Sequence, residues 1–198
     1  RANRPEALPS SVVPLIVAAG DGCGLAVAHM AWGYEVPWKN GPVFNTRIET
    51  ALRSEGSMWA ESFARRRCLV PARGFYESHA TETVPSERTG RPVKRQYAFA
   101  APDGAPLLLA GVHDRGRFSL VTTEPNAAVA PVHNRMPLAL EPGEAALWLR
   151  AAARPRCRAA DRASRALSRR KLRRRKGHDA GAATEPTSLG IATRRCFT

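Results

Sequence analysis

The sequence has few cysteines and no long apolar run, and both shortages exclude classes of protein. Its cysteines stand far apart, at Cys23, Cys68, Cys157 and Cys196, without a CxxC pair or the Cys/His spacing of a zinc site. We interpret them as the free thiols of a cytoplasmic protein. No stretch of about 18 apolar residues is present, and no charged-then-apolar opening resembles a secretion signal. The sequence therefore predicts no metal site, no disulfide framework and no membrane span.

Acidic residues are also few, and they are scarcest after residue 150. The 198 residues carry 31 Lys and Arg against 17 Asp and Glu, a formal net charge of +14. Residues 1–150 hold 17 against 14, a net of +3, whereas residues 151–198 hold 14 against 3, a net of +11. We expect one folded domain over residues 1–150 and a basic, poorly ordered tail over 151–198. The tail fits a solvated segment and a nucleic-acid contact equally well, and its most basic part, 168–176, fits either a helix or disorder.

Short apolar segments bounded by turn residues predict a sheet with few helices. The expected strands are residues 12–17, 25–32, 96–101, 106–112, 117–123 and 138–140. The first two form a hairpin, and those from 96 to 123 form an antiparallel meander. The expected helices cover residues 46–53, 57–66 and 144–150. The predicted fold class is α+β, mainly antiparallel β, with a few short flanking helices.

The stretch from Arg67 to Glu77 has its own expected design. An apolar strand runs into a Pro/Gly turn at residues 71–74, and a second, aromatic strand ends on the carboxylate of Glu77. A polar segment, His79–Arg95, follows and is typical of a long surface loop. The expectation is a hairpin followed by that loop.

Three blocks place an amide, a carboxylate and an imidazole on otherwise apolar elements, each near a basic residue. The three residues are Asn45, Glu77 and His133. Together they suit an acid–base site that faces an anionic substrate. Each also has a plainer interpretation: a helix cap for the asparagine, a surface carboxylate at a sheet edge for the glutamate, and a structural histidine.

The order and spacing of these blocks resemble the SOS response-associated peptidase family, also called abasic-site processing proteins. The matching segments are Trp32–Trp38, Asn45–Thr50, Arg67–Glu77 and Thr122–Pro137, with a weaker match at Arg1–Pro5. The resemblance covers about residues 1–150 and implies the family's sheet or barrel core. It also implies a cytoplasmic, nucleoid-associated monomer without a cofactor, whose partner is single-stranded DNA containing abasic sites.

The function that the resemblance implies is a covalent protein–DNA cross-link, together with peptidase-type self-processing. In the family, the amine of an amino-terminal cysteine condenses with the ring-opened sugar aldehyde, and its thiol closes a thiazolidine. By resemblance, Asn45 holds the sugar and the terminal amine. Glu77 moves protons during imine formation and reversal, and His133 assists opening of the sugar ring.

The resemblance also implies residues that contact DNA. They are Arg47, Arg135, Trp38, Pro37, Thr122 and Asn3. The two arginines would hold phosphates, or alternatively form surface ion pairs with Glu49 or Glu124. Trp38 and Pro37 in the aromatic loop would wedge or stack against a base, with Trp32 either assisting them or lying in the core.

Two features depart from the family pattern. The family's opening Met-Cys-Gly-Arg is not in the sequence, which starts with Arg1 and Ala2, and Ser78 stands where the family usually has tryptophan. The expectation is a truncated family member or, alternatively, a catalytically dead, non-covalent single-stranded DNA-binding protein. A Cys/His/Asn hydrolase built on Cys68 is a weaker alternative, because a cysteine on an apolar strand is usually buried and inert.

Overall fold

A computed structural model describes residues 6–19, 24–53, 56–150, 173–176 and 191–193. Its strands are β1 (Glu6–Ala7), β2 (Val12–Ala18), β3 (Leu25–Trp32), β4 (Asn45–Arg47), β5 (Arg67–Pro85), β6 (Pro92–Ala100), β7 (Leu107–Asp114), β8 (Arg117–Thr123), β9 (Met136–Pro137), β10 (Ala139–Leu140), β11 (Arg173–Lys176) and β12 (Ile191–Thr193). The helices are α1 (Ile48–Leu52), α2 (Ala60–Arg65) and α3 (Pro142–Arg150). Asn3 and most of the basic tail lie outside the described residues.

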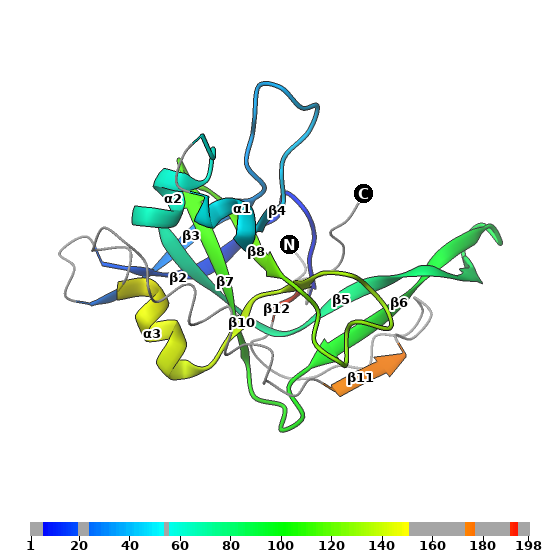
Figure 1. The fold of residues 1–198 in the computed structure, drawn as a ribbon. Coiled ribbons are helices and arrows are strands. Elements are labelled where there is room, and N and C mark those ends of the chain that lie inside the picture. Colours follow the sequence, from blue (N-terminus) through cyan, green and yellow to red (C-terminus); the bar gives the residue numbers. More distant parts are fainter. Residues whose placement is uncertain (1–5, 20–23, 54–55, 151–172, 177–190, 194–198) are drawn as a thin grey trace.

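The strands form one 12-stranded, mainly antiparallel sheet that closes on itself, as Figure 1 shows. The pairings β5–β2, β2–β3, β3–β8, β8–β7 and β7–β5 make a closed ring. Only β3–β8 is parallel within this ring. The three short helices lie outside it. The predicted fold class, α+β with mainly antiparallel strands and few helices, is therefore confirmed.

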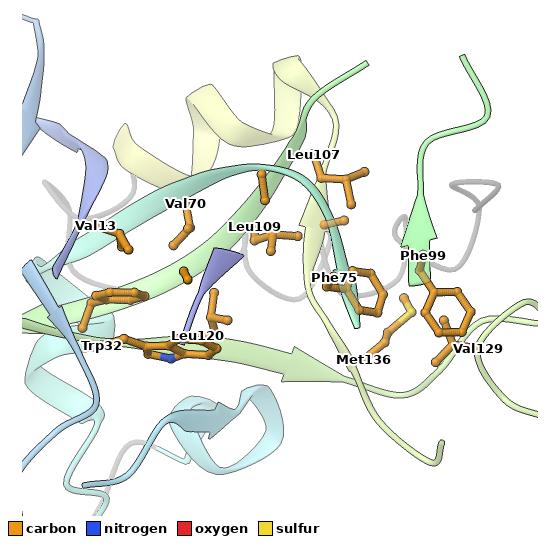
Figure 2. Packing of buried hydrophobic residues seen from close by; sticks show 14 of the residues in the cluster. Val13, Trp32, Val70, Phe75, Phe99, Leu107, Leu109, Leu120, Val129 and Met136 are labelled. Atoms are coloured by element: carbon orange, nitrogen blue, oxygen red, sulfur yellow. The ribbon is translucent and has the colours of Figure 1, made fainter. Parts of the chain in front are cut away.

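The apolar side chains of the ring fall into two clusters, because successive residues of a strand point to opposite faces. Cys68, Val70 and Ala72 of β5 belong to the first cluster, whereas Leu69 belongs to the second. Figure 2 shows the first cluster, in which Trp32 is only 1% exposed and stacks on Phe118. In the second cluster the helices cover the outer face of the sheet. Because residues on both faces of the sheet are buried, the strands that carry the candidate site residues are held in place.

The expected hairpin at residues 67–77 is wrong, because β5 runs through it as one strand of 19 residues. Residues Arg67–Ala72 pair with β7, and from Phe75 onward the strand pairs with β6. The change of partner falls at Gly74, where a Cβ would lie 2.4 Å from the carbonyl oxygen of Phe99. Glycine thus allows a close backbone approach here, and it does not mark a reversal of the chain.

The expected surface loop at 79–95 is also wrong. The segment forms the outer half of a hairpin between β5 and β6, which projects from the body of the molecule in Figure 1. Its residues are mostly exposed or half-buried, so the usual apolar/polar alternation is weak. A ribbon with water on both faces resembles a loop in composition.

Smaller differences concern pairing and helix starts. The segment 96–101 pairs with β5, not with its neighbour β7, so the expected meander holds only for β7 and β8. The first helix begins at Ile48 because the three residues before it form β4, parallel to β8. The second begins at Ala60, after a turn in which the Ser57 carbonyl accepts its backbone N–H at 3.0 Å.

Two strands lie beyond residue 150. β11 pairs antiparallel with β6, and β12 pairs parallel with β1 and β5. Residues 173–176 are thus extended, and the remainder of the basic segment 168–176 lies outside the described residues.

Candidate acid–base site

Glu77 and His133 are brought together by a link between β5 and the loop after β8. The backbone N–H of Ala80 donates to the carbonyl of Val132 at 3.0 Å, which ties the loop to the strand three residues beyond Glu77. Val132 is itself buried, so an apolar anchor precedes the histidine. The result is a distance of 4.0 Å between Nδ1 of His133 and Oε2 of Glu77.

The loop that bears His133 has a defined local structure. The Asn126 side-chain oxygen accepts the N–H groups of Ala128 and Val129, both at 3.1 Å, in the manner of an Asx turn. Val129 is fully buried, and the His133 N–H donates to its carbonyl at 3.0 Å. The imidazole therefore projects from a turn that is packed into the core.

The Glu77 carboxyl is buried and lacks a hydrogen bond to any described residue. Glu77 is 5% exposed, and burial raises the pKa of its side chain to about 9. Since no bond to a donor offsets the loss of solvation, the neutral acid is favoured at pH 7. A buried carboxyl whose pKa is strongly raised is typical of a functional position.

The imidazole of His133 is oriented by the backbone of Arg135. Its Nδ1 lies 3.1 Å from both the nitrogen and the carbonyl oxygen of Arg135. When Nδ1 accepts the Arg135 N–H, the proton of the neutral ring is on Nε2. At 4.0 Å the Glu77 carboxyl is too distant for a hydrogen bond, and it would form an ion pair only if it were ionised. The site therefore pairs a neutral acid with an oriented imidazole.

Arg135 connects this pair to a second group of polar residues. Its guanidinium donates to both carboxylate oxygens of Glu49, at 3.0 and 2.9 Å, and to the carbonyl of Thr122 at 2.8 Å. Of the two ion-pair partners expected from the sequence, Glu49 is the one used. Thr122 is buried, and across the parallel pairing of β4 and β8 it lies opposite Arg47, whose side chain is exposed.

Asn45 is not a helix cap. It is the first residue of β4, half-buried and paired with Leu120, and the residue before α1 is Arg47, which makes no side-chain capping bond. Within the described part of the chain, no hydrogen bond or ion pair joins Asn45 to Glu77 or His133. Its role toward a substrate stays a prediction.

The aromatic turn projects from the sheet next to β4, as Figure 1 shows. Trp38 is 69% exposed and its neighbour Pro37 is exposed as well, whereas Trp32 is buried and donates its indole N–H to the carbonyl of Phe44 at 3.0 Å. Of the two alternatives for Trp32, the core position is the correct one. Of the two tryptophans, Trp38 is the one that offers an aromatic face to a ligand.

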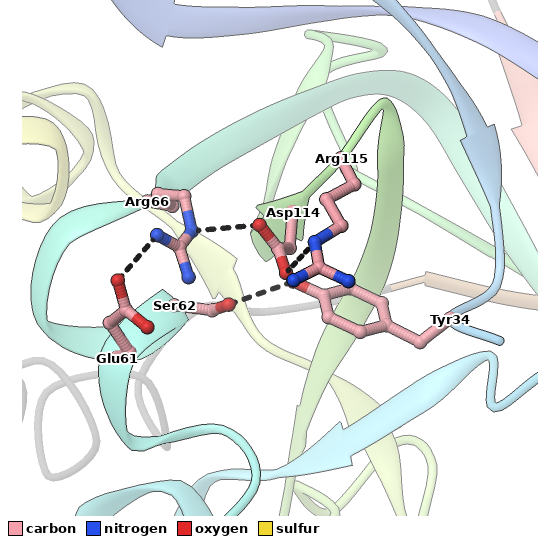
Figure 3. Close-up of polar contacts among 6 residues, drawn as sticks. All are labelled: Tyr34, Glu61, Ser62, Arg66, Asp114 and Arg115. Atoms are coloured by element: carbon pink, nitrogen blue, oxygen red, sulfur yellow. Dashed lines mark hydrogen bonds and ion pairs between the residues drawn. The ribbon is translucent and has the colours of Figure 1, made fainter. Parts of the chain in front are cut away.

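The base of this turn is fixed by the contacts drawn in Figure 3. The Tyr34 hydroxyl donates to Ser62 at 3.1 Å, and burial raises its pKa well above the ordinary range. Arg66 joins the same region through ion pairs with Glu61 and Asp114. The Tyr34–Ser62 bond therefore ties the start of the turn to α2.

Cys68 is fully buried, and burial raises the pKa of its thiol far above the ordinary value. A Cβ on the facing Gly111 would lie 2.8 Å from its sulfur, so the thiol has no room for a substrate. This geometry favours the inert interpretation over a Cys68 hydrolase. Among the described residues no three His, Cys, Asp or Glu side chains form a metal site, and no described helix is long and apolar enough to span a membrane.

One neighbour of the site was missed from the sequence. Tyr97 of β6 lies opposite Glu77 in the strand register, is buried, and donates its hydroxyl to Glu82 at 2.6 Å. The sequence did contain a signal for the hairpin that places Tyr97 there. Thr81, Thr83 and Val84 are β-branched, and such residues favour a strand over a loop.

The sequence comparisons point to one family. A model of the SOS response associated peptidase (SRAP) family matches residues 2–175. The abasic site processing protein YoqW of Bacillus subtilis is 26% identical over 151 residues, which cover 68% of this chain and 62% of YoqW. The abasic site processing protein YedK of Escherichia coli is 28% identical over 128 residues, 60% of this chain and 53% of YedK. The chain thus covers less than two thirds of the length of each of these relatives.

Solved structures show the same fold. A phage-related protein from Bordetella bronchiseptica is 27% identical with a TM-score of 0.65, over 86% of this chain and 79% of that protein. A protein from Bacteroides thetaiotaomicron has a TM-score of 0.59 at 22% identity, over 83% of this chain and 73% of its own. The second likeness concerns the fold alone.

Proposed function

The chain belongs to the SOS response associated peptidase family, and from this premise we propose that it processes abasic sites in DNA. The relatives named abasic site processing proteins support this function. The single observation that carries it is the burial of the Glu77 carboxyl, which raises its pKa to about 9, at 4.0 Å from the imidazole of His133. Such a proton donor accelerates the loss of water when an aldehyde condenses with an amine at neutral pH.

The proposed reaction forms a covalent cross-link with the ring-opened sugar. An amine attacks the aldehyde carbon, a C–N bond forms, and the resulting carbinolamine must lose its hydroxyl group as water. The Glu77 acid donates the proton to that hydroxyl and takes up a proton in the reverse direction. The thiol then adds to the carbon of the protonated imine, so that a C–S bond replaces the C=N π bond and closes the thiazolidine, and the thiol proton returns to the Glu77 carboxylate. In the family, both groups belong to the cysteine that becomes the amino terminus once the first methionine is removed.

His133 has a different proposed task, because its ring is held in another way. When Nδ1 accepts the Arg135 N–H, the ring proton is on Nε2 and would be donated to the oxygen of the closed sugar ring. Ring opening produces the aldehyde that the amine attacks. Two groups 4.0 Å apart thus serve successive steps.

DNA would be held on the face that carries these groups. Trp38 and Pro37 would stack against a base next to the lesion, and Asn45 would bond to the sugar. Arg47, whose side chain is exposed, would contact a flanking phosphate, whereas the Arg135 guanidinium is already held by Glu49 and Thr122. Single-stranded DNA is the proposed substrate, because stacking on an exposed tryptophan needs an unpaired base.

The test compares two forms of the protein, the sequence as it stands and the same chain with Met-Cys-Gly placed before Arg1. Each is incubated with a single-stranded oligonucleotide containing one abasic site and is run on a denaturing gel. We expect a covalent product only from the form with the added cysteine, and only with the abasic oligonucleotide. A matched form with Met-Ala-Gly is the control. Absence of an adduct from the cysteine form, with the protein folded, would refute the proposal.

A second candidate, non-covalent binding of single-stranded DNA, is favoured by the exposed Trp38 and by the net charge of +14. It predicts salt-sensitive binding that yields no adduct from either form. Removal of residues 151–198 distinguishes its two versions, because binding by the folded face persists and binding by the basic tail is lost.

A further inference from the structure

We propose that Glu49 is a positioning residue for His133 and acts through Arg135. This inference rests on the proposed function, since it assigns Glu49 a part in the same site. No direct contact between Glu49 and His133 is needed. The connection is a chain of hydrogen bonds that passes through one arginine.

The first link is the fork between Glu49 and Arg135. Two parallel N–H···O bonds of 3.0 and 2.9 Å fix the plane of the guanidinium, and a third bond of 2.8 Å reaches the carbonyl of Thr122. The arginine side chain is only 13% exposed. Bidentate, charge-assisted bonds of this kind impose a geometry as well as an attraction. Arg135 is thereby fastened to α1 and β8 at once.

The charges around Glu49 favour the ionised form of the fork. Partial burial by itself raises the pKa of Glu49, but the hydrogen bond from Arg135 and the charges of Arg135 and Arg47 lower it further than burial raises it. The net effect is a pKa below the ordinary value. The carboxylate therefore keeps its charge at neutral pH, and the fork is intact under the conditions of the proposed reaction.

The second link is the backbone of Arg135 itself. Its N–H and its carbonyl oxygen both lie 3.1 Å from Nδ1 of His133, so the place of this one residue decides which of them the ring uses. The N–H selects the neutral tautomer with its proton on Nε2, whereas the carbonyl selects a proton on Nδ1. A shift of the Arg135 backbone would change that selection and move the ring relative to Glu77.

Glu49 is the removable part of this chain of bonds. The Thr122 carbonyl and the pairing of Pro137 with Thr122 would still hold the segment near β8 without it. Loss of the carboxylate should therefore loosen Arg135 without unfolding the protein. A misplaced proton donor lowers a reaction rate strongly, so we expect a loss of about tenfold or more in the rate of adduct formation.

The experiment measures the ring directly, without DNA. Two-bond proton–nitrogen NMR of protein labelled with ¹⁵N-histidine reports which ring nitrogen carries the proton, and a His133→Gln variant identifies the signal. In the unchanged protein we expect the Nε2–H form. In Glu49→Ala we expect a mixture of the two tautomers, and in Glu49→Gln, which keeps one acceptor oxygen, a smaller change. Glu124→Ala, an exposed carboxylate on the same loop, is the matched control and should leave the ring unchanged.

A kinetic measurement accompanies the spectra. In the form with the added cysteine, Glu49→Ala should slow adduct formation while the affinity for the oligonucleotide stays equal or rises, because a negative charge near Arg47 has been removed. Loss of affinity and rate together would indicate a merely structural role and overturn the proposal. An Nε2–H ring that is unchanged in both Glu49 variants would also overturn it. If the spectra change as expected but no variant ever forms an adduct, the proposed function fails and the positioning role stands.

Discussion

Replacing Glu77 by glutamine should change how stability depends on pH, and the structure fixes the sign. Burial raises the pKa of this side chain from an ordinary 4.5 to about 9. Between those values the folded protein keeps a proton that the unfolded chain releases. Raising the pH therefore favours unfolding: the stability contributed by the protonated carboxyl is complete below pH 4.5 and is lost as the pH rises toward 9.

The size of the effect follows from the free energy of one proton per pH unit, about 1.4 kcal/mol. From pH 5 to pH 8 the unchanged protein should lose about 4 kcal/mol of unfolding free energy through this one group. Glutamine has the shape of the neutral acid and does not titrate. The Glu77→Gln protein should therefore match the unchanged protein at pH 5 to within about 1 kcal/mol and exceed it by about 4 kcal/mol at pH 8. Since Glu77 is only 5% exposed, solvent screening is a small correction.

Urea unfolding at pH 5, 6.5 and 8 measures this difference for both proteins. Glu124→Gln controls for the loss of one exposed carboxylate and should follow the unchanged protein at every pH. If the Glu77→Gln and unchanged proteins keep the same difference at pH 5 and pH 8, Glu77 ionises normally and cannot be a neutral acid at pH 7. The same substitution should slow adduct formation by about 100-fold or more, because glutamine has no acidic proton.

Four further substitutions test individual residues. Trp38→Ala should weaken binding of single-stranded DNA by about 1–3 kcal/mol in a fluorescence titration while leaving urea unfolding unchanged, whereas Trp32→Ala should destabilise the protein by about 3–5 kcal/mol. Arg47→Gln should reduce the slope of log affinity against log salt by about 0.7 if the arginine holds one phosphate, and an unchanged slope would remove it from the interface. Cys68→Ala should leave adduct formation intact, and the Cys68 thiol should react with a thiol reagent only after unfolding. If a folded Cys68→Ala protein no longer forms the adduct, the hypothesis of a Cys68 nucleophile would be restored.

The sequence predicted those strands that are rich in apolar residues. Residues 12–17, 25–32 and 117–123 carry the apolar patterns of ring strands, and each is a strand in the structure. The segment from residue 79 to 95 was misjudged because a ribbon exposed on both faces has no apolar side to display. At Gly74, composition could not distinguish a chain reversal from a change of partner strand. That distinction depends on the backbone of Phe99, which lies 25 residues further along the chain.

The pairing of Glu77 with His133 lay beyond any local pattern. Their sequence separation is 56 residues, and their approach depends on one backbone bond between Ala80 and Val132. The family resemblance named both residues, but it carried no information about protonation. Burial without a donor, which makes the Glu77 acid neutral, is visible only once the strands β5 and β6 are placed.

Different features of the structure govern the two groups. Glu77 and His133 lie 4.0 Å apart, and the loss of solvation on burial raises the pKa of the Glu77 carboxyl to about 9. The carboxyl therefore keeps its proton, while the Arg135 backbone occupies Nδ1 of the imidazole. The protonation of Glu77 depends on burial, whereas the orientation of the His133 ring depends on hydrogen bonds. The two properties can therefore be altered separately. Substitution of Glu77 changes the first, and substitution of Glu49 changes the second.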